Sequence, residues 1–91
     1  MDIFVIDFSD CKSELQIHKK LKKTLHFPDY YGENWDALWD MLTGYLDYPK
    51  IIKLKGLNSL PLELHSSVKT LLEVFRDAVK EEPELRLVVE D

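Results

Sequence analysis

The sequence predicts a small α/β domain with a three-stranded parallel sheet flanked by about four helices. Three short apolar runs, at residues 3–8, 50–55 and 85–89, have the composition of strands. Helical stretches of about forty and about thirty residues separate them, which is too long for tight hairpins and suits helical crossovers. The 91 residues, 45% of them hydrophobic, suffice for one core. We therefore expect a single domain over residues 1–91.

The first strand and the first helix follow from local patterns. Residues 3–8 are apolar at nearly every position, so we expect both faces of this strand to be covered. Ser13 with Gln16 forms a capping box at the start of a helix. The buried stripe of that helix repeats every four residues, at Ile17, Leu21 and Leu25. Pro28 ends the segment.

A short helix is predicted next, from Asn34 as its N-cap to about Thr43, with Gly44 as the stop. Leu38 and Leu42 of this helix have the spacing of core residues. Residues 50–55 then alternate isoleucine and leucine with lysine, which indicates a strand with one partly exposed face.

The last third of the chain predicts a helical turn, a long helix and a final strand. Pro61 indicates the turn, between residues 57 and 64. Ser66 or Ser67 is the expected cap of the long helix. Its apolar stripe consists of Val68, Leu71, Leu72, Phe75 and Val79.

Charge and composition exclude several classes of function. The net charge is −5, and no basic stripe is present to neutralise the phosphates of a nucleic acid. The one basic cluster, which we expect to be a solvated helix face, consists of Lys19, Lys20, Lys22 and Lys23. The N-terminal apolar run is too short for a signal peptide or a membrane span. We expect a soluble cytoplasmic protein that binds neither nucleic acid nor membrane.

The cysteine and histidine residues do not indicate a site. Cys11 is the single cysteine, so it cannot form a disulfide within the chain, which suits a reducing cytoplasm. His18, His26 and His65 are scattered over separate elements, and we expect them to be surface or cap residues.

One segment, residues 28–48, accounts for the whole net charge. It carries five carboxylates and six aromatic rings without a single Lys, Arg or His. The acids are Asp29, Glu33, Asp36, Asp40 and Asp47, and the rings are Tyr30, Tyr31, Trp35, Trp39, Tyr45 and Tyr48. So many rings cannot all reach the core, and exposed Tyr and Trp beside carboxylates are typical of an interface that binds Arg and His. The segment therefore predicts a basic protein partner.

Within this segment, Asp36, Asp40 and Thr43 share one stripe of the short helix, at spacings i, i+4 and i+7. The two like charges repel by a few tenths of a kcal/mol, and only Asp36 lies near the positive end of the helix dipole. A position that breaks a local rule without compensation is a candidate contact for a partner. The simpler alternative is that both aspartates face water.

The paired carboxylates also suggest a hydrolase or a divalent-metal site, although the segment has no basic residue to assist catalysis. We therefore expect no enzyme activity, no cofactor and no metal.

A family resemblance covers essentially the whole domain. The run FPDYYGENWDALWDMLTGYLDYP, residues 27–49, closely resembles the inhibitory segment of the barstar family, and LLEVFRDA at residues 71–78 continues the similarity. The motif YYGENxDALWDxLTG is long enough to be highly specific. The resemblance implies an intracellular inhibitor whose short helix and preceding loop plug the active site of a secreted, guanyl-specific ribonuclease of the barnase type. It implies one-to-one binding, and we expect a monomer when the partner is absent.

The resemblance also implies roles for particular residues. Asp40 should occupy the place of a substrate phosphate, Asp36 should pair with a rim arginine, and Tyr30 should pack on the catalytic histidine. The remaining expected contacts are Tyr31, Gly32, Asn34, Trp35, Trp39, Thr43, Gly44, Tyr45 and Asp77. Three of the expected contact positions depart from the family pattern. Tyr45 replaces a tryptophan and Trp35 a leucine, so partner preference should differ in detail, and Asp77 replaces a glutamate of a peripheral ion pair with a shorter side chain. The bond between Tyr48 and Pro49 matches one that is cis in the family. A barstar-like fold with another basic protein as its partner remains the alternative.

Overall fold

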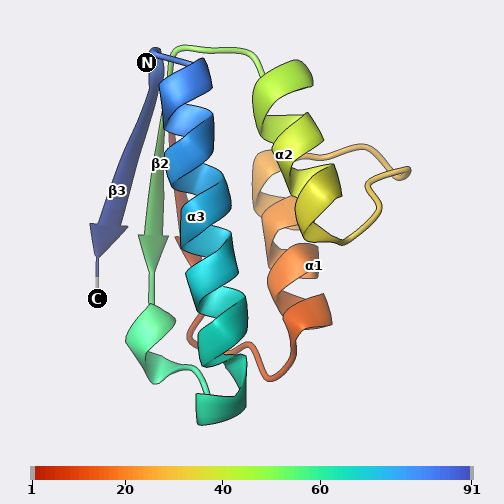
Figure 1. Ribbon diagram of the computed structural model, residues 1–91, viewed down its shortest axis with the longest axis vertical. Coiled ribbons are helices and arrows are strands. Elements are labelled where there is room, and N and C mark those ends of the chain that lie inside the picture. Colours follow the sequence, from red (N-terminus) through yellow and green to blue (C-terminus); the bar gives the residue numbers. More distant parts are fainter. Residues whose placement is uncertain (1, 91) are drawn as a thin grey trace.

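The computed structural model describes residues 2–90 as a parallel sheet with helices on one side (Figure 1). The elements in chain order are β1 (Asp2–Asp7), α1 (Glu14–Leu25), α2 (Trp35–Gly44), β2 (Lys50–Lys55), α3 (His65–Glu81) and β3 (Leu85–Glu90). The strands are parallel in the order β1-β2-β3. This confirms the predicted class and sheet.

The predicted helix count was too high by one. The described residues contain three α-helices, and the turn expected between residues 57 and 64 is a pair of 3₁₀ turns, Leu57–Ser59 and Leu62–Leu64. Gly56, with φ of +79°, precedes the first of these, and Pro61 precedes the second. Positive φ at Gly56 and the fixed φ of Pro61 divide the segment into two short turns, so no longer helix forms.

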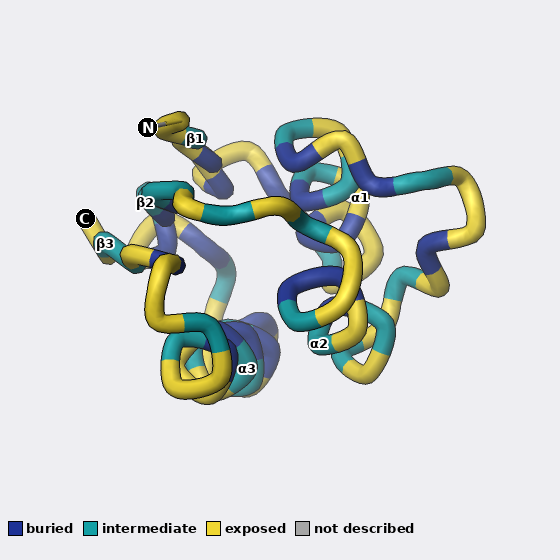
Figure 2. The backbone as a smooth tube through the Cα atoms, turned by 90° about the horizontal axis from the view of Figure 1, so that it is seen from above, coloured by how far each residue is buried: buried dark blue, intermediate teal, exposed yellow. Residues whose placement is uncertain are grey.

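The prediction that both faces of β1 are covered was wrong. Ile3 and Val5 are 61% and 48% exposed, whereas Ile6 is fully buried. Figure 2 shows why, because α1, α2 and α3 all lie on the same side of the three strands. Two right-handed crossovers that step in the same direction across a sheet place their helices on one face. The other face of the sheet stays open.

The helix ends agree with prediction in α1 and differ in α3. The N–H of Gln16 donates to Ser13 Oγ at 3.2 Å, as the capping box predicts. In α3 the N-cap position is Leu64, which makes no side-chain cap, so neither Ser66 nor Ser67 has the expected role. Ser67 is instead buried and donates to Glu14 Oε1 at 2.7 Å, which joins α3 to α1.

The core lies between the sheet and the three helices. All three helices and the strands β1 and β2 contribute side chains with no exposed surface, among them Ile6, Ile17, Leu21, Leu38, Leu42, Ile52, Leu54, Leu71 and Phe75. The helix α2 packs against α3, and its inner face is part of this core. The orientation of α2 is therefore fixed by apolar burial.

Candidate functional site

The short helix α2 forms the centre of the predicted site. Asn34 caps it, because its Oδ1 accepts a hydrogen bond from the N–H of Ala37 at 2.8 Å. Leu38 and Leu42 are both fully buried, as predicted. The helix ends at Gly44, one residue beyond the predicted end. A cap at one end and two buried leucines on the inner face hold the outer face in one orientation.

That outer face carries Asp36 and Asp40, one helical turn apart and both exposed. Within the part of the chain that the structure describes, neither aspartate is in an ion pair. Asp36 lies in the first turn, where the helix dipole favours a negative charge. Asp40 lies farther along and lacks that compensation. The pair therefore presents two carboxylates whose charge no neighbouring cation neutralises.

Aromatic rings flank these carboxylates at both ends of α2. Tyr30 in the preceding loop is 73% exposed, and Tyr45 after the helix is 43% exposed. Trp35 and Trp39 are partly buried and pack against the core. The prediction that some of the rings stay at the surface is confirmed. We call the surface formed by Tyr30, Asp36, Trp39, Asp40 and Tyr45 the acidic-aromatic face.

Tyr31 is placed differently from its exposed neighbour. Its side chain is only 4% exposed, and its hydroxyl lies 2.7 Å from Nδ1 of His18, which is 1% exposed. The ring of His18 also lies against Trp35, with 4.3 Å between ring centroids. Tyr31 was among the expected partner contacts. Its side chain is instead buried beneath the loop, where its hydrogen bond with His18 helps to hold the loop in place.

The expectation that His18 is a surface or cap residue was wrong. Its position is three residues before Leu21 and seven before Leu25, a spacing that places it on the buried side of α1. His26 and His65 are exposed, as expected. The spacing of His18 therefore matches a buried position of α1. The prediction placed it at the surface because histidine is a polar residue.

Burial sets the protonation states of this pair. Burial raises the pKa of Tyr31 and keeps its hydroxyl neutral. This hydroxyl shares a hydrogen bond with Nδ1 of His18, whose tautomer decides which of the two groups donates. Burial also lowers the pKa of His18, an effect that the carboxylates of Glu14 and Glu33 partly oppose. In either tautomer, Nε2 of His18 has no hydrogen-bond partner within residues 2–90. Protonation would therefore place a positive charge in the interior, beside the loop.

We expect the protein to lose stability on mild acidification through His18. The histidine pKa is 6.5 in the unfolded chain and lower in the folded protein, so the unfolded state binds more protons between those two values. The free energy of unfolding should fall as the pH drops below about 6.5. Urea unfolding at a series of pH values above and below this point measures the loss.

Two histidine variants separate His18 from other titrating groups. His18→Asn keeps a polar atom near the position of Nδ1 but does not titrate, so it should flatten the pH dependence in this range. His65→Asn changes an exposed histidine and should leave the dependence as in the wild type. An unchanged dependence in His18→Asn would show that other groups cause the acid sensitivity.

Two acids of the segment are paired with lysines of α1, which the sequence did not predict. Lys19 Nζ lies 3.4 Å from Glu33 Oε2, without hydrogen-bond geometry, and Lys22 Nζ lies 3.9 Å from Asp29 Oδ1. Although residues 28–48 contain no basic residue, lysines of α1 therefore neutralise two of its acids, Asp29 and Glu33. In each pair at least one side chain is open to solvent, so the pairs contribute little stability. They confine the unneutralised charge of the segment to Asp36, Asp40 and Asp47.

Internal hydrogen bonds fix the end of the segment. Thr43 Oγ1 donates to the carbonyl of Trp39 at 2.8 Å, and the Tyr48 hydroxyl donates to the carbonyl of Leu42 at 2.6 Å. The Tyr48–Pro49 bond is cis, as the resemblance implied. Tyr48 is therefore turned inward and does not contribute to the acidic-aromatic face.

The remaining expected contacts lie around this face. Gly32 has little space beside it, since an added Cβ would lie 3.2 Å from Asn34 Nδ2, whereas a Cβ on Gly44 would meet nothing within 4 Å. Asp77 is exposed on α3 and lies 3.8 Å from Lys80. It belongs to a different element from the other contacts, so it lies at the margin of the site.

In the described range, no group of three or more His, Cys, Asp or Glu residues is arranged to hold a metal ion. None of the helices there combines the length and apolar character needed to cross a bilayer.

The arrangement of carboxylates and rings in the acidic-aromatic face suits binding of a surface rich in cations.

Comparison with known proteins agrees with this description. The family model described as "Barstar (barnase inhibitor)" matches residues 1–90. A protein of Bacillus subtilis (strain 168) named "Putative ribonuclease inhibitor YrdF" is 40% identical over 87 residues, which cover 94% of this chain and 96% of that protein. On both grounds, the chain belongs to the barstar family.

Proposed function

We propose that this protein inhibits a guanyl-specific microbial ribonuclease of the barnase type by inserting the acidic-aromatic face into the active site of the enzyme. The observation that carries the proposal is the pair Asp36 and Asp40, exposed and unneutralised on a helix that its cap and core contacts hold rigid. A ribonuclease active site binds phosphates with cationic side chains, so a preorganised pair of carboxylates is complementary to it.

Each group has a distinct part in the proposed complex. The Asp40 carboxylate takes the place of a substrate phosphate among the catalytic Arg and His side chains, and Asp36 pairs with an arginine at the rim. Tyr30, whose ring is 73% exposed, packs on the catalytic histidine. Trp39 and Thr43 line the contact, with Asn34 at the start of the helix. The chain performs no reaction, and its activity consists of affinity.

The partner and its location follow from the same chemistry. An inhibitor that blocks a secreted ribonuclease protects the RNA of the cell in which both are present, so we propose a cytoplasmic site of action and one-to-one binding. Asp29 and Glu33 are already paired with lysines. Long-range attraction of a basic enzyme therefore depends mainly on Asp36, Asp40 and Asp47.

An RNA-cleavage assay tests the proposal. Increasing amounts of the protein are added to a fixed amount of a barnase-type ribonuclease at low and at high salt. We expect cleavage to cease at one equivalent, with weaker inhibition at high salt because ions screen the exposed carboxylates. Full cleavage at a large excess of the protein would exclude this class of enzyme as the partner and favour another basic protein.

Gly44 provides a steric test of the same face. Gly44→Phe should leave folding stability unchanged or slightly raised, because an added Cβ meets no atom within 4 Å at this exposed position and phenylalanine is a better helix former than glycine. If a partner packs closely here, we expect the ring to weaken inhibition by about tenfold or more, as overpacking of a close interface typically costs 1–3 kcal/mol. Urea unfolding and the cleavage assay measure the two effects separately, and unchanged inhibition would place Gly44 outside the contact.

A further inference from the structure

Strand β3 has an unpaired edge. It pairs with β2 alone among residues 2–90, and Figure 1 shows it at the outer margin of the sheet. An open edge presents backbone N–H and C=O groups to which a further strand can hydrogen-bond. Proteins usually cover such an edge or guard it with charges, so the side chains of β3 decide whether it accepts a strand.

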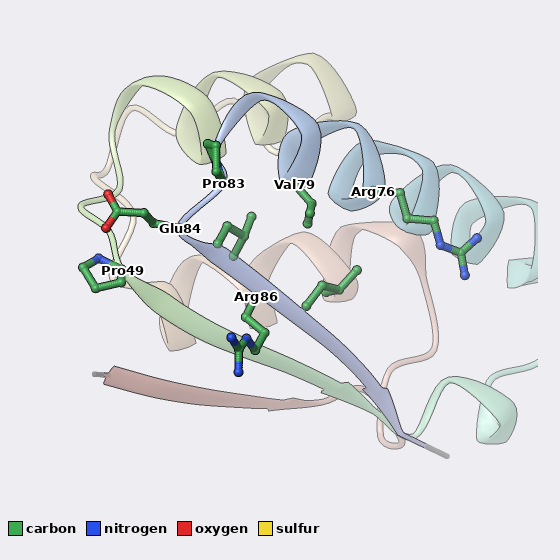
Figure 3. Close-up of a pocket in the computed structure, with 8 residues that line it drawn as sticks. Pro49, Arg76, Val79, Pro83, Glu84 and Arg86 are labelled. Atoms are coloured by element: carbon green, nitrogen blue, oxygen red, sulfur yellow. The ribbon is translucent and has the colours of Figure 1, made fainter.

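Two cavities with partly apolar linings lie along the seam between β3 and α3. The first has a volume of about 540 Å³ and is lined by Val79, Leu85 and Leu87 and also by the charged residues Arg76, Glu84 and Arg86 (Figure 3). The second, of about 410 Å³, is lined in part by Val68, Leu72 and Val89. Val89 is 42% exposed although it alternates onto the helix side of the sheet with Leu85 and Leu87. The seam is thus incompletely covered by residues 2–90.

The helix α3 has a second apolar stripe that faces this seam. Its first stripe, with Leu71, Phe75 and Ala78, is fully buried in the core. Val68, Leu72 and Val79 are only partly buried, and all three line the two cavities. Apolar positions on two sides of one helix indicate that two surfaces are available for burial. The core fills one of them.

The charges of β3 are complementary to a second copy of the same strand. Arg86, Val88 and Glu90 alternate onto the open face of the sheet. If a second β3 runs antiparallel with Val88 opposite its own copy, each Arg86 lies opposite a Glu90. Within residues 2–90, no carboxylate lies within ion-pair distance of Arg86. Cross-strand pairs of opposite charge stabilise a sheet, so this register gives Arg86 a partner.

Other registers and the other edge are less favourable. Centring the pair on Leu87 would place Glu84 opposite Glu90, which repels. The edge strand β1 carries only acids at its ends, Asp2 and Asp7, so an antiparallel copy can gain no pair of opposite charges. The charge pattern therefore selects one register of one edge.

We propose that two copies of this chain pair through β3, antiparallel about a two-fold axis normal to the sheet, to form one continuous six-stranded sheet. The axis places both α3 helices on the same face, where the second stripe of each lies beside that of its partner. The interface is isologous, as in most homodimers. This proposal replaces the expectation of a monomer.

The dimer leaves both acidic-aromatic faces free. In Figure 2 the loop before α2 and the strand β3 lie at opposite sides of the molecule. Pairing through β3 therefore does not block α2, and one dimer can hold two partner molecules.

Sedimentation velocity over micromolar to millimolar protein concentrations tests the dimer, with charge reversals at the two paired positions. We expect reversible dimerisation of the wild type. Arg86→Glu and Glu90→Arg should each raise the dissociation constant by about tenfold or more, because each reversal makes two symmetric pairs repulsive. An equimolar mixture of the two variants should dimerise again, because both pairs then have opposite charges. Lys23→Glu, an exposed change on α1, is the control and should dimerise as the wild type does.

The mixture is the decisive sample. Glu90 also lies 3.3 Å from Lys53 within the chain, so a single reversal alters that pair as well, whereas recovery in the mixture depends only on contacts between copies. A wild type that stays monomeric over the whole range would overturn the proposal. Dimerisation that neither reversal weakens would also overturn it and would indicate association through another surface.

Discussion

Replacing Asp40 with alanine should lower the affinity for the ribonuclease by a factor of a few hundred to a few thousand without unfolding the protein. In the proposed complex the carboxylate is buried among cations, and removing one partner of a buried charge pair costs about 3–5 kcal/mol. The fold should be unharmed, because Asp40 is exposed, has no ion pair among the described residues, and repels Asp36. Calorimetric titration measures the affinity, and thermal unfolding measures the stability.

Asp47→Ala is the matched control for this variant. Asp47 is also exposed and lies in the same acidic segment, so its removal changes net charge and long-range attraction by the same amount. It lies beyond the helix, so we expect its loss to change affinity by less than about tenfold, as for a charge outside the buried contact. Equal effects of the two substitutions would mean that the segment acts only through its total charge and that Asp40 has no special position.

Leu38→Ala should have the largest effect on stability among the substitutions considered. Leu38 is fully buried on the inner face of α2, and truncating a buried leucine costs about 2–5 kcal/mol. In a domain of this size each kcal/mol shifts the Tm by about 4–8 °C, so we expect the Tm to fall by about 10 °C or more. Differential scanning calorimetry measures this shift.

Leu15→Ala is its control, because Leu15 is a leucine that is 50% exposed on α1. A surface substitution of this kind usually changes stability by no more than about 0.5 kcal/mol. If the two substitutions lowered the Tm equally, α2 would not be held on the core as its burial indicates, and the rigidity on which the proposed function depends would be in doubt.

Local patterns predicted most of the fold. The capping groups Ser13 and Asn34 act within three residues of their own position, so the sequence alone located them correctly. The exposed face of β1 was not predictable in the same way, because an apolar run does not reveal on which side the crossover helices lie. The start of α3 was misplaced for a related reason, since Ser67 bonds to Glu14, distant in the sequence.

In the candidate site, too, features within one segment were predicted and contacts between segments were not. Asp36, Asp40 and the rings around them lie on one continuous segment, so spacing and the family motif located them together. Contacts between segments were missed, including the pairing of Glu33 with Lys19 and the hydrogen bond between Tyr31 and His18. A spacing rule within one element carries no information on which residues of another element approach it.

The most direct test of the central claim is a calorimetric titration of the protein into a barnase-type ribonuclease, once with the active site free and once with it occupied by a nucleotide inhibitor. If Asp40 takes the place of a substrate phosphate, binding to the free enzyme should be tight and one-to-one, and the nucleotide should weaken it in proportion to its own occupancy. Equal affinity for the free and the nucleotide-bound enzyme would contradict the claim, because the acidic-aromatic face would then bind outside the active site.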